Sequence, residues 1–185
     1  MERLLPEKTL LLVVDVQERL AAAMPGPTMD RLVANASILL DAARLLGVRV
    51  MASEQYPKGL GPMVAAIGAK LSIVGAAPIE KLHFDACSEP RFALALATLA
   101  PRAVVVVGME AHVCVFQTAR ELVRRGYATY VVADAVASRT EENRRLGLAM
   151  CERAGAYVAP TETIVFDWLG RAGSDAFKAV SKLVR

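Results

Sequence analysis

The stretch at residues 102–126 constrains the fold of this chain more than any other part of the sequence. It begins with an unbroken run of valines at 104–107, which is typical of a strand buried on both faces of a parallel sheet. Gly108 ends the run, and apolar residues then recur three or four positions apart with charged residues between them. This second pattern predicts an amphipathic helix that ends at Gly126. A strand leading directly into a helix is the repeating unit of an α/β fold.

Cys114 lies at the turn between this strand and this helix. The first turn of a helix has backbone N–H groups without an intrahelical partner, and the helix dipole places partial positive charge there. Both features stabilise a thiolate. The sequence therefore indicates a nucleophilic cysteine at this turn.

Apolar runs alternate with helical patterns along the whole chain. Besides the valine run, we expect strands at residues 10–14, 48–52, 71–74, 128–133 and 156–159. We expect helices at residues 28–46, 90–100 and 161–169, one capped by Thr140 and one capped by Ser174. Apolar positions expected to face the sheet include Leu94, Leu146 and Met150. The alternation predicts a three-layer α/β fold, a doubly wound, mostly parallel sheet of about six strands with helices on both faces.

Composition excludes several classes of protein. The 185 residues are 55% hydrophobic and 22% charged, which favours one packed globular domain at 1–185. The net charge of +3 is small and scattered, so we expect no nucleic-acid partner. No apolar run could span a membrane and no signal peptide is visible, so we expect a cytoplasmic protein without membrane contact. Three cysteines without close spacing predict neither a disulfide framework nor a zinc site.

Two charged residues are further candidates for the site. Asp15 directly follows the apolar run at 10–14. Ligands of open α/β sheets bind at the carboxyl ends of the strands, although a turn aspartate is equally consistent with this position. Lys81 lies in a loop, where a lone lysine is usually on the surface.

Asp15, Lys81 and Cys114 occur in the order found in the isochorismatase-like cysteine hydrolases, which include nicotinamidases and N-carbamoylsarcosine amidases. The resemblance rests on LLLVVDVQ at residues 10–17, KLHFDAC at 81–87, VVVVGMEAHVCV at 104–115 and VVADAVASR at 131–139. It covers nearly the whole chain. The SEQYPKGLG loop and the FKAVSKLV ending look most similar to the small isochorismatase-domain-containing proteins.

This resemblance implies that Asp15, Lys81 and Cys114 form a catalytic triad. The Cys114 thiolate would attack an amide-type carbonyl, and water would hydrolyse the resulting thioester. Asp15 would accept the thiol proton and later protonate the leaving group, while Lys81 would hold both groups electrostatically. A cis peptide is implied between Met109 and Glu110. It would point the N–H of Glu110, beside that of Cys114, at the oxyanion.

The resemblance also indicates what this chain lacks. Metal-binding nicotinamidases have an Asp-x-His arrangement after the second strand, where this chain reads SEQY at residues 53–56. We therefore expect no metal and no cofactor, and we disfavour nicotinamide as the substrate. The side chains expected to line the substrate pocket are Gln17, Gln55, Tyr56 and Phe84.

Other hypotheses stay open at this point. Vinyl-ether hydrolysis of isochorismate would depend on Asp15 as a proton donor more than on Cys114. A non-catalytic scaffold or binding protein could retain the site, and a redox sensor would need Cys87 as the partner of Cys114. His112 is disfavoured as the base, because neighbouring side chains at such a turn point in different directions. The high apolar fraction and the resemblance predict a homo-oligomer, a dimer or tetramer, that acts on a small molecule.

Overall fold

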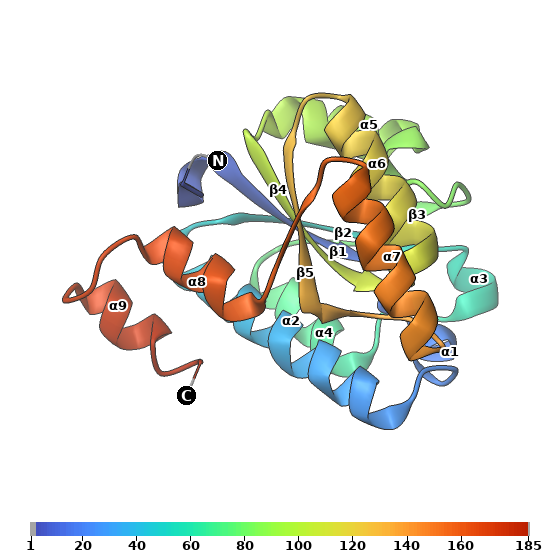
Figure 1. Cartoon of the computed structure of the whole chain (residues 1–185), viewed down its shortest axis with the longest axis horizontal. Helices are drawn as coiled ribbons and strands as arrows, with labels where there is room; N and C mark the ends of the chain where they lie inside the picture. Colours follow the sequence, from blue (N-terminus) through green and yellow to red (C-terminus); the bar gives the residue numbers. More distant parts are fainter. Residues whose placement is uncertain (1–2, 185) are drawn as a thin grey trace.

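The structure is a computed structural model and describes residues 3–184. In this part of the chain, six parallel strands form one sheet in the order β3-β2-β1-β4-β5-β6, with helices on both faces (Figure 1). The strands are β1 Thr9–Val14, β2 Arg49–Gln55, β3 Ile79–Lys81, β4 Ala103–Met109, β5 Ala128–Ala137 and β6 Tyr157–Ala159. The predicted three-layer α/β fold is confirmed.

The helices divide between the two faces of the sheet. The first face is covered by α2 Gly26–Leu46, α4 Ala65–Ile73, α8 Thr161–Leu169 and α9 Asp175–Val180. The second face is covered by α5 Pro90–Leu99, α6 Phe116–Arg124 and α7 Glu141–Arg153. Two short helices, α1 Glu18–Ala21 and α3 Pro57–Leu60, follow β1 and β2. No helix of residues 3–184 combines the length and the apolar character that crossing a membrane requires.

The central strands read as unbroken apolar runs because both of their faces are buried. Along β1, Leu11 and Val13 pack in the core beneath α2, while Leu10 and Leu12 pack in the core beneath α5 and α6. The valines of β4 alternate between the same two cores. Each strand therefore contributes side chains to both layers, as a doubly wound sheet requires.

Several predicted strand boundaries were wrong. The strand expected at 71–74 is the end of α4, and the third strand is β3, a three-residue edge strand without an apolar run. β5 continues past Ala133 to Ala137. β4 also continues through Gly108, whose φ is 123° and where a Cβ atom would lie 2.0 Å from the carbonyl oxygen of Val14. Glycine there permits close approach of two strands and does not end β4.

The expected burial of three large side chains was also wrong. Leu94 is 71% exposed, because the buried stripe of α5 consists of Phe92 and Leu96. Leu146 and Met150 are exposed on α7 as well. The buried residues of α7 are the small Gly147 and Cys151, and Gly147 lets the helix approach the backbone of Ala111 and His112 closely.

The helix expected at 28–46 begins at Gly26, after Pro25 and without a side-chain cap, but the caps predicted at Thr140 and Ser174 are confirmed. The Thr140 hydroxyl accepts a hydrogen bond from the N–H of Asn143, and the Ser174 hydroxyl accepts one from the N–H of Phe177. These caps satisfy backbone donors at the starts of α7 and α9.

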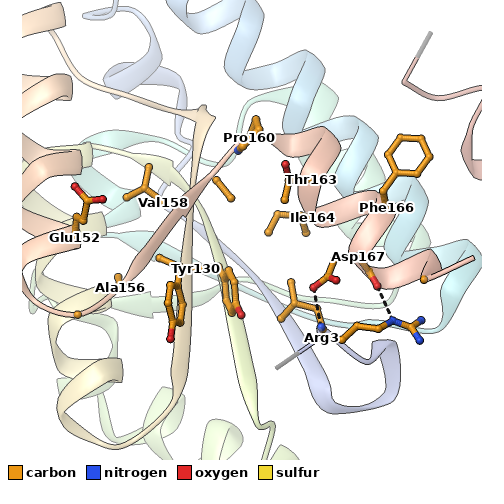
Figure 2. A pocket seen from close by; sticks show the side chains of 15 residues that line it. Arg3, Tyr130, Glu152, Ala156, Val158, Pro160, Thr163, Ile164, Phe166 and Asp167 are labelled. Atoms are coloured by element: carbon orange, nitrogen blue, oxygen red, sulfur yellow. Dashed lines mark hydrogen bonds between the residues drawn. The ribbon is translucent and has the colours of Figure 1, made fainter. Parts of the chain in front are cut away.

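A groove of about 1090 Å³ lies beside the edge strand β6 (Figure 2). The rings of Tyr130 and Tyr157 pack there with centroids 4.9 Å apart. Arg3 donates to the carbonyl oxygen of Asp167 and so fastens the start of the chain to the end of α8. None of the three predicted triad residues lines this groove.

At the carboxyl edge of the sheet, the chain leaves β1 and β4 toward opposite faces. The segment after β1 leads to α2 on the first face, whereas β4 leads to α6 on the second. Such a divergence between neighbouring parallel strands is where open α/β sheets bind ligands. Asp15 follows β1 and Cys114 follows β4, so both predicted site residues lie at this point.

Candidate active site

Asp15 and Lys81 form a buried ion pair at the carboxyl edge of the sheet. Nζ of Lys81 lies 2.7 Å from Oδ2 of Asp15, and the two side chains are 1% and 0% exposed. The Ser53 hydroxyl donates to the second carboxylate oxygen at 2.8 Å. Asp15 has a φ of 50°, a left-handed conformation that aspartate tolerates better than most residues. Lys81 is therefore no surface residue, in contrast to the usual expectation for a loop lysine.

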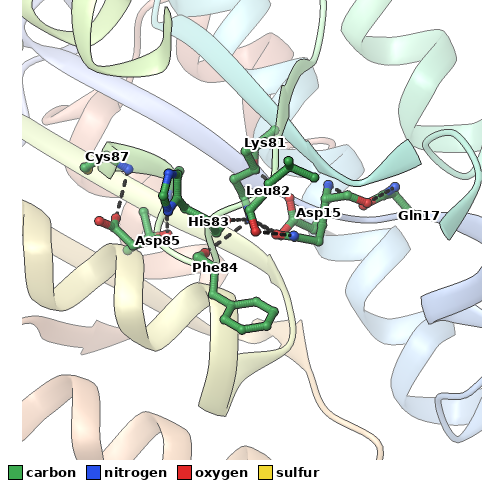
Figure 3. A network of polar contacts seen from close by, with 12 residues as sticks. Asp15, Gln17, Lys81, Leu82, His83, Phe84, Asp85 and Cys87 are labelled. Atoms are coloured by element: carbon green, nitrogen blue, oxygen red, sulfur yellow. Dashed lines mark hydrogen bonds and ion pairs between the residues drawn. The ribbon is translucent and has the colours of Figure 1, made fainter. Parts of the chain in front are cut away.

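The Lys81 ammonium has further acceptors around it (Figure 3). It donates to Oε1 of Gln55 at 2.7 Å and to the carbonyl oxygens of His83 and Phe84 at 3.1 and 3.2 Å. A buried ammonium requires such partners, because its desolvation would otherwise be too costly. The loop after β3 thus wraps around its own lysine and fixes the position of the positive charge.

Cys114 lies in one π-helical turn, Ala111–Val115, between β4 and α6. The N–H of Val115 closes this turn on the carbonyl oxygen of Glu110 at 3.2 Å. Because β1 and β4 are neighbours, the turn faces Asp15, and the Asp15 carboxyl group lies close enough to the Cys114 thiol for each group to shift the pKa of the other. The Cys114 residue is 5% exposed and belongs to the core on the second face of the sheet.

The peptide bond between Met109 and Glu110 is cis. The Glu110 carboxylate accepts hydrogen bonds from N and Nε of Arg139, each at 3.1 Å. His112 is hydrogen-bonded through Nδ1 to the Ser138 hydroxyl at 3.0 Å, so its ring is held by the residue that follows β5.

All three thiols have raised pKa values. Burial is the main cause for Cys87, Cys114 and Cys151 alike and raises the pKa of each to about 12. For Cys114 the Asp15 carboxylate raises the pKa further, and the Lys81 ammonium opposes that effect. The expectation that this turn stabilises a thiolate was wrong, because burial and a facing carboxylate outweigh the helix terminus. Burial also raises the pKa of Asp15, against the opposing charge of Lys81.

The four residues expected to line the pocket fall into two pairs. Gln17 and Gln55 are buried, and their side-chain amides are used in hydrogen bonds within the protein. Tyr56 and Phe84 are 52% and 54% exposed. Tyr56 also lines a groove of about 380 Å³ that reaches Lys81 and Leu82. Contact of any of the four with a substrate stays a prediction.

Sequence reasoning missed three polar contacts of the site. Ser53 and Gln55 are part of β2, which extends three residues beyond its predicted end at residue 52. The Glu110–Arg139 ion pair joins the segments after β4 and β5. Gln55 is among the residues expected in the pocket, but its contact with Lys81 is not, and neither is that of Ser53 with Asp15. The two-residue period of a strand, which places Ser53 and Gln55 on one face of β2, is the signal that could have revealed both contacts. Within residues 3–184, no cluster of His, Cys, Asp and Glu side chains has a composition suited to a metal ion.

Comparisons with known proteins agree with this architecture. Residues 9–163 match the family model of the isochorismatase domain. The chain is 32% identical to isochorismatase domain-containing protein 2A of Mus musculus, over 99% of this chain and 85% of that protein. It is 34% identical to the secreted isochorismatase effector Isc1 of Phytophthora sojae, over 99% and 87%.

Solved structures give the same result for the fold. The structure of MAR1 ribonuclease from Caenorhabditis elegans superposes with a TM-score of 0.89 at 35% identity, covering 99% of this chain and 92% of that one. YcaC from Pseudomonas aeruginosa superposes with a TM-score of 0.89 at 21% identity, covering 98% and 91%. Because YcaC is only 21% identical to this chain, that similarity concerns the fold alone.

Proposed function

The chain belongs to the isochorismatase family, and from that premise we propose that it is a cysteine hydrolase that cleaves an amide-type C–N bond in a small molecule. The observation that carries the proposal is the buried Asp15–Lys81 ion pair against the Cys114 thiol. A buried carboxylate within reach of a thiol is the arrangement that a base-assisted nucleophile needs.

The first half of the proposed reaction forms a thioester. As Cys114 attacks the carbonyl carbon, its thiol proton moves to the Asp15 carboxylate, and the raised pKa of that carboxyl group makes it a stronger base than an exposed aspartate. The backbone N–H groups of Glu110 and Cys114 stabilise the oxyanion. When the C–N bond breaks, the Asp15 carboxylic acid protonates the leaving nitrogen.

The second half releases the acid product. Water attacks the thioester carbonyl and gives a proton to Asp15, now again a carboxylate. The C–S bond breaks, and the sulfur takes that proton back to restore the neutral thiol. Lys81 remains an ammonium throughout and offsets the negative charge that passes between the sulfur, the carboxylate and the oxyanion.

Burial of the site favours a small substrate. The three proposed catalytic residues are all buried, with exposed fractions of 0% for Asp15, 2% for Lys81 and 5% for Cys114. The largely apolar side chains of Tyr56, Leu82 and Phe84 are exposed near Lys81, just after the ends of β2 and β3. They support a substrate with an apolar portion next to its amide group.

A panel of small amides, N-carbamoyl compounds, isochorismate and RNA tests the proposal, with product release followed by mass spectrometry. For an amide that is turned over, we expect Cys114→Ala to lower kcat/KM at least ~10³-fold, since the nucleophile is lost. Cys151→Ala is the matched control and should leave kcat/KM within about twofold. Wild-type turnover by Cys114→Ala would overturn the proposal.

The other compounds of the panel distinguish the alternative functions from amide hydrolysis. Hydrolysis of isochorismate that survives Cys114→Ala but not Asp15→Asn would replace the thioester route with vinyl-ether chemistry. RNA cleavage that depends on Cys114 would extend to this chain the activity in the name of its C. elegans neighbour. Absence of turnover for every compound would favour a scaffold that retains the site.

We also propose that the protein forms a homo-oligomer in solution. YcaC from Escherichia coli is described as an octameric hydrolase. In this chain, Ile73, Leu82 and Leu94 are each more than two-thirds exposed, which is unusual for large aliphatic side chains. Light scattering after gel filtration gives the mass directly, and a monomer at micromolar concentration would contradict the proposal.

A further inference from the structure

We propose that Gln55 is a positioning residue, which holds the Lys81 ammonium against Asp15, and that Gln17 locks Gln55 in place. The proposal rests on the function proposed above, because Lys81 needs positioning only if the Cys114 site acts. Neither glutamine needs to touch the substrate for this role.

The first argument is the number of protons on Lys81. An ammonium has three N–H donors, and the Lys81 ammonium faces four acceptors. Its two short contacts, both 2.7 Å, are to Oδ2 of Asp15 and Oε1 of Gln55. The two carbonyl contacts of the loop are longer, at 3.1 and 3.2 Å. Gln55 is therefore the neutral partner that holds the ammonium as closely as the carboxylate does.

The second argument is the orientation of the Gln55 amide. Its Nε2 donates to the carbonyl oxygen of Leu82 at 2.8 Å. That bond requires the NH₂ group on the side of Leu82, so the oxygen must point at Lys81. A flipped amide would place NH₂ against an ammonium and leave a carbonyl facing a carbonyl. The side chain has one stable orientation, and it is the one that binds Lys81.

The third argument is the part that Gln17 plays. Its Oε1 accepts from the N–H of Gln55 at 2.8 Å, and its Nε2 donates to the carbonyl oxygens of Gln55 and Gly61 at 3.0 and 2.7 Å. The side chain thus pairs with the backbone at the end of β2 as a neighbouring strand would. Gln17 is also tied back to Asp15, because its N–H donates to the Asp15 carbonyl oxygen at 2.8 Å.

These contacts form a closed ring. It runs from Asp15 through Gln17 to Gln55, then to Lys81 and back to Asp15. A shift of any member lengthens at least one hydrogen bond to a buried polar group, which is unfavourable. The ring therefore keeps the ammonium and the carboxylate in one arrangement while charge moves between the thiol and Asp15.

The position of Lys81 has a measurable effect on Cys114. The ammonium lowers the pKa of the Cys114 thiol, in opposition to burial and to Asp15. If Gln55 holds Lys81 in place, its removal should weaken this effect and reduce the thiolate fraction. Below the pKa of the thiol, the alkylation rate is proportional to that fraction, so a rise of one pKa unit slows alkylation about tenfold.

The experiment compares Gln55→Met with Gln117→Met. Both replace an amide with an apolar chain of similar length, but Gln117 lies on α6, and in residues 3–184 its amide has no hydrogen-bond partner. We measure the rate of Cys114 alkylation by iodoacetamide between pH 7 and 9, with peptide mapping. We expect Gln55→Met to slow alkylation about threefold to tenfold and Gln117→Met to leave it unchanged.

Two further variants keep the test decisive if Gln55→Met folds poorly. Gln55→Glu retains an oxygen for Lys81 but adds negative charge beside it, so alkylation should again be slower. Gln17→Met leaves Gln55 itself intact and should slow alkylation by a smaller factor. A melting temperature that falls while the alkylation rate of Cys114 stays equal to that of wild type, or rises, would overturn the proposal.

The rate of Cys114 alkylation also tests the positioning role of Gln55 independently of the hydrolase function. Alkylation reports the thiol without any substrate. If Cys114→Ala abolishes turnover but Gln55→Met leaves alkylation unchanged, the hydrolase stands and the positioning role is wrong. If Gln55→Met slows alkylation but no compound of the panel is hydrolysed, the ring acts on the thiol and the hydrolase function is wrong.

Discussion

The turn that carries Cys114 and the part of α7 that carries Cys151 pack against each other, and each contains a buried thiol. Burial raises the pKa of both thiols to about 12. The sulfurs differ in their neighbours: Asp15 and Lys81 act on the pKa of Cys114, whereas only burial and a backbone hydrogen bond act on that of Cys151. The pKa value alone therefore does not mark the nucleophile. The charged residues beside Cys114, which are Asp15 and Lys81, distinguish it from Cys151.

The largest predicted effect comes from removing one of those partners. Lys81→Met leaves the Asp15 carboxylate buried without a counter-ion, which we expect to cost about 3–5 kcal/mol of unfolding free energy and to abolish activity. Urea denaturation and turnover measure the two effects. Lys70→Met is the control, because the Lys70 and Asp41 side chains are 27% and 32% exposed, and it should cost about 1 kcal/mol or less. Equal losses in both variants would contradict the buried pair.

The second prediction concerns the contact between α7 and the turn that carries Cys114. A Cβ atom on Gly147 would lie 2.6 Å from backbone atoms of Ala111 and His112, so Gly147→Ala must displace α7 or the Cys114 turn. We expect a loss of about 1–3 kcal/mol in stability and a lower kcat.

The matched control is another helical glycine. Gly68 on α4 has Met63 Cβ as its nearest neighbour, at 3.7 Å from an added Cβ. Gly68→Ala should be neutral or stabilise the protein by up to about 1 kcal/mol, since alanine is the better helix former. A Gly147→Ala variant with the stability and kcat of wild type would show that the turn does not depend on this contact.

The site residues were not equally predictable from the sequence. Asp15 and Cys114 could be located from the sequence, because each follows an unbroken apolar run that ends at the carboxyl edge of the sheet. Lys81 could be assigned only by resemblance, since β3 is a short edge strand with no apolar run.

The remaining errors of the sequence-based predictions arose because tertiary contacts, which the sequence alone does not show, decide which residues are buried. Predicted strands ended where polar residues began, but β2 continues through Ser53 and Gln55 because their side chains bond to the site. On α7, Gly147 and Cys151 are buried while larger apolar residues are exposed, which depends on how closely a helix approaches the sheet. The pKa of Cys114 likewise depends on burial, a tertiary property.

The next prediction concerns how the Cys151 thiol affects the unfolding free energy at alkaline pH. Its native thiol keeps its proton up to about pH 12, whereas the unfolded thiol loses its proton near the ordinary pKa of ~8.5. Between these values the unfolded state binds fewer protons, so stability falls as pH rises, by about 1.4 kcal/mol per pH unit for each such thiol. Cys151→Ala should therefore show a shallower decline in unfolding free energy from pH 9 to 10.5. An unchanged slope would mean that the Cys151 thiol ionises equally in both states.

The smallest predicted effect concerns the start of α7. The Thr140 hydroxyl accepts from the N–H of Asn143 at 3.1 Å, so Thr140→Ala should cost about 1 kcal/mol of unfolding free energy. Because the cap lies far along α7 from Cys151, kcat/KM and Cys114 alkylation should stay within error of wild type. Thr140→Ser restores the acceptor and should recover the stability. A loss of activity larger than the loss of stability would mean that the start of α7 also shapes the site.

The central claim is that Asp15 keeps the Cys114 thiol protonated and serves as its base, and Asp15→Asn tests it most directly. The measurement is the rate of Cys114 alkylation by iodoacetamide at pH 8, with Cys87 and Cys151 as internal references. Without the carboxylate, the thiol pKa should fall, although burial still keeps it above its ordinary value, and Lys81 still favours the thiolate, so alkylation should accelerate about tenfold or more even as hydrolysis is lost. An alkylation rate equal to or slower than that of wild type would contradict the account, because Asp15 would then not control the proton on Cys114.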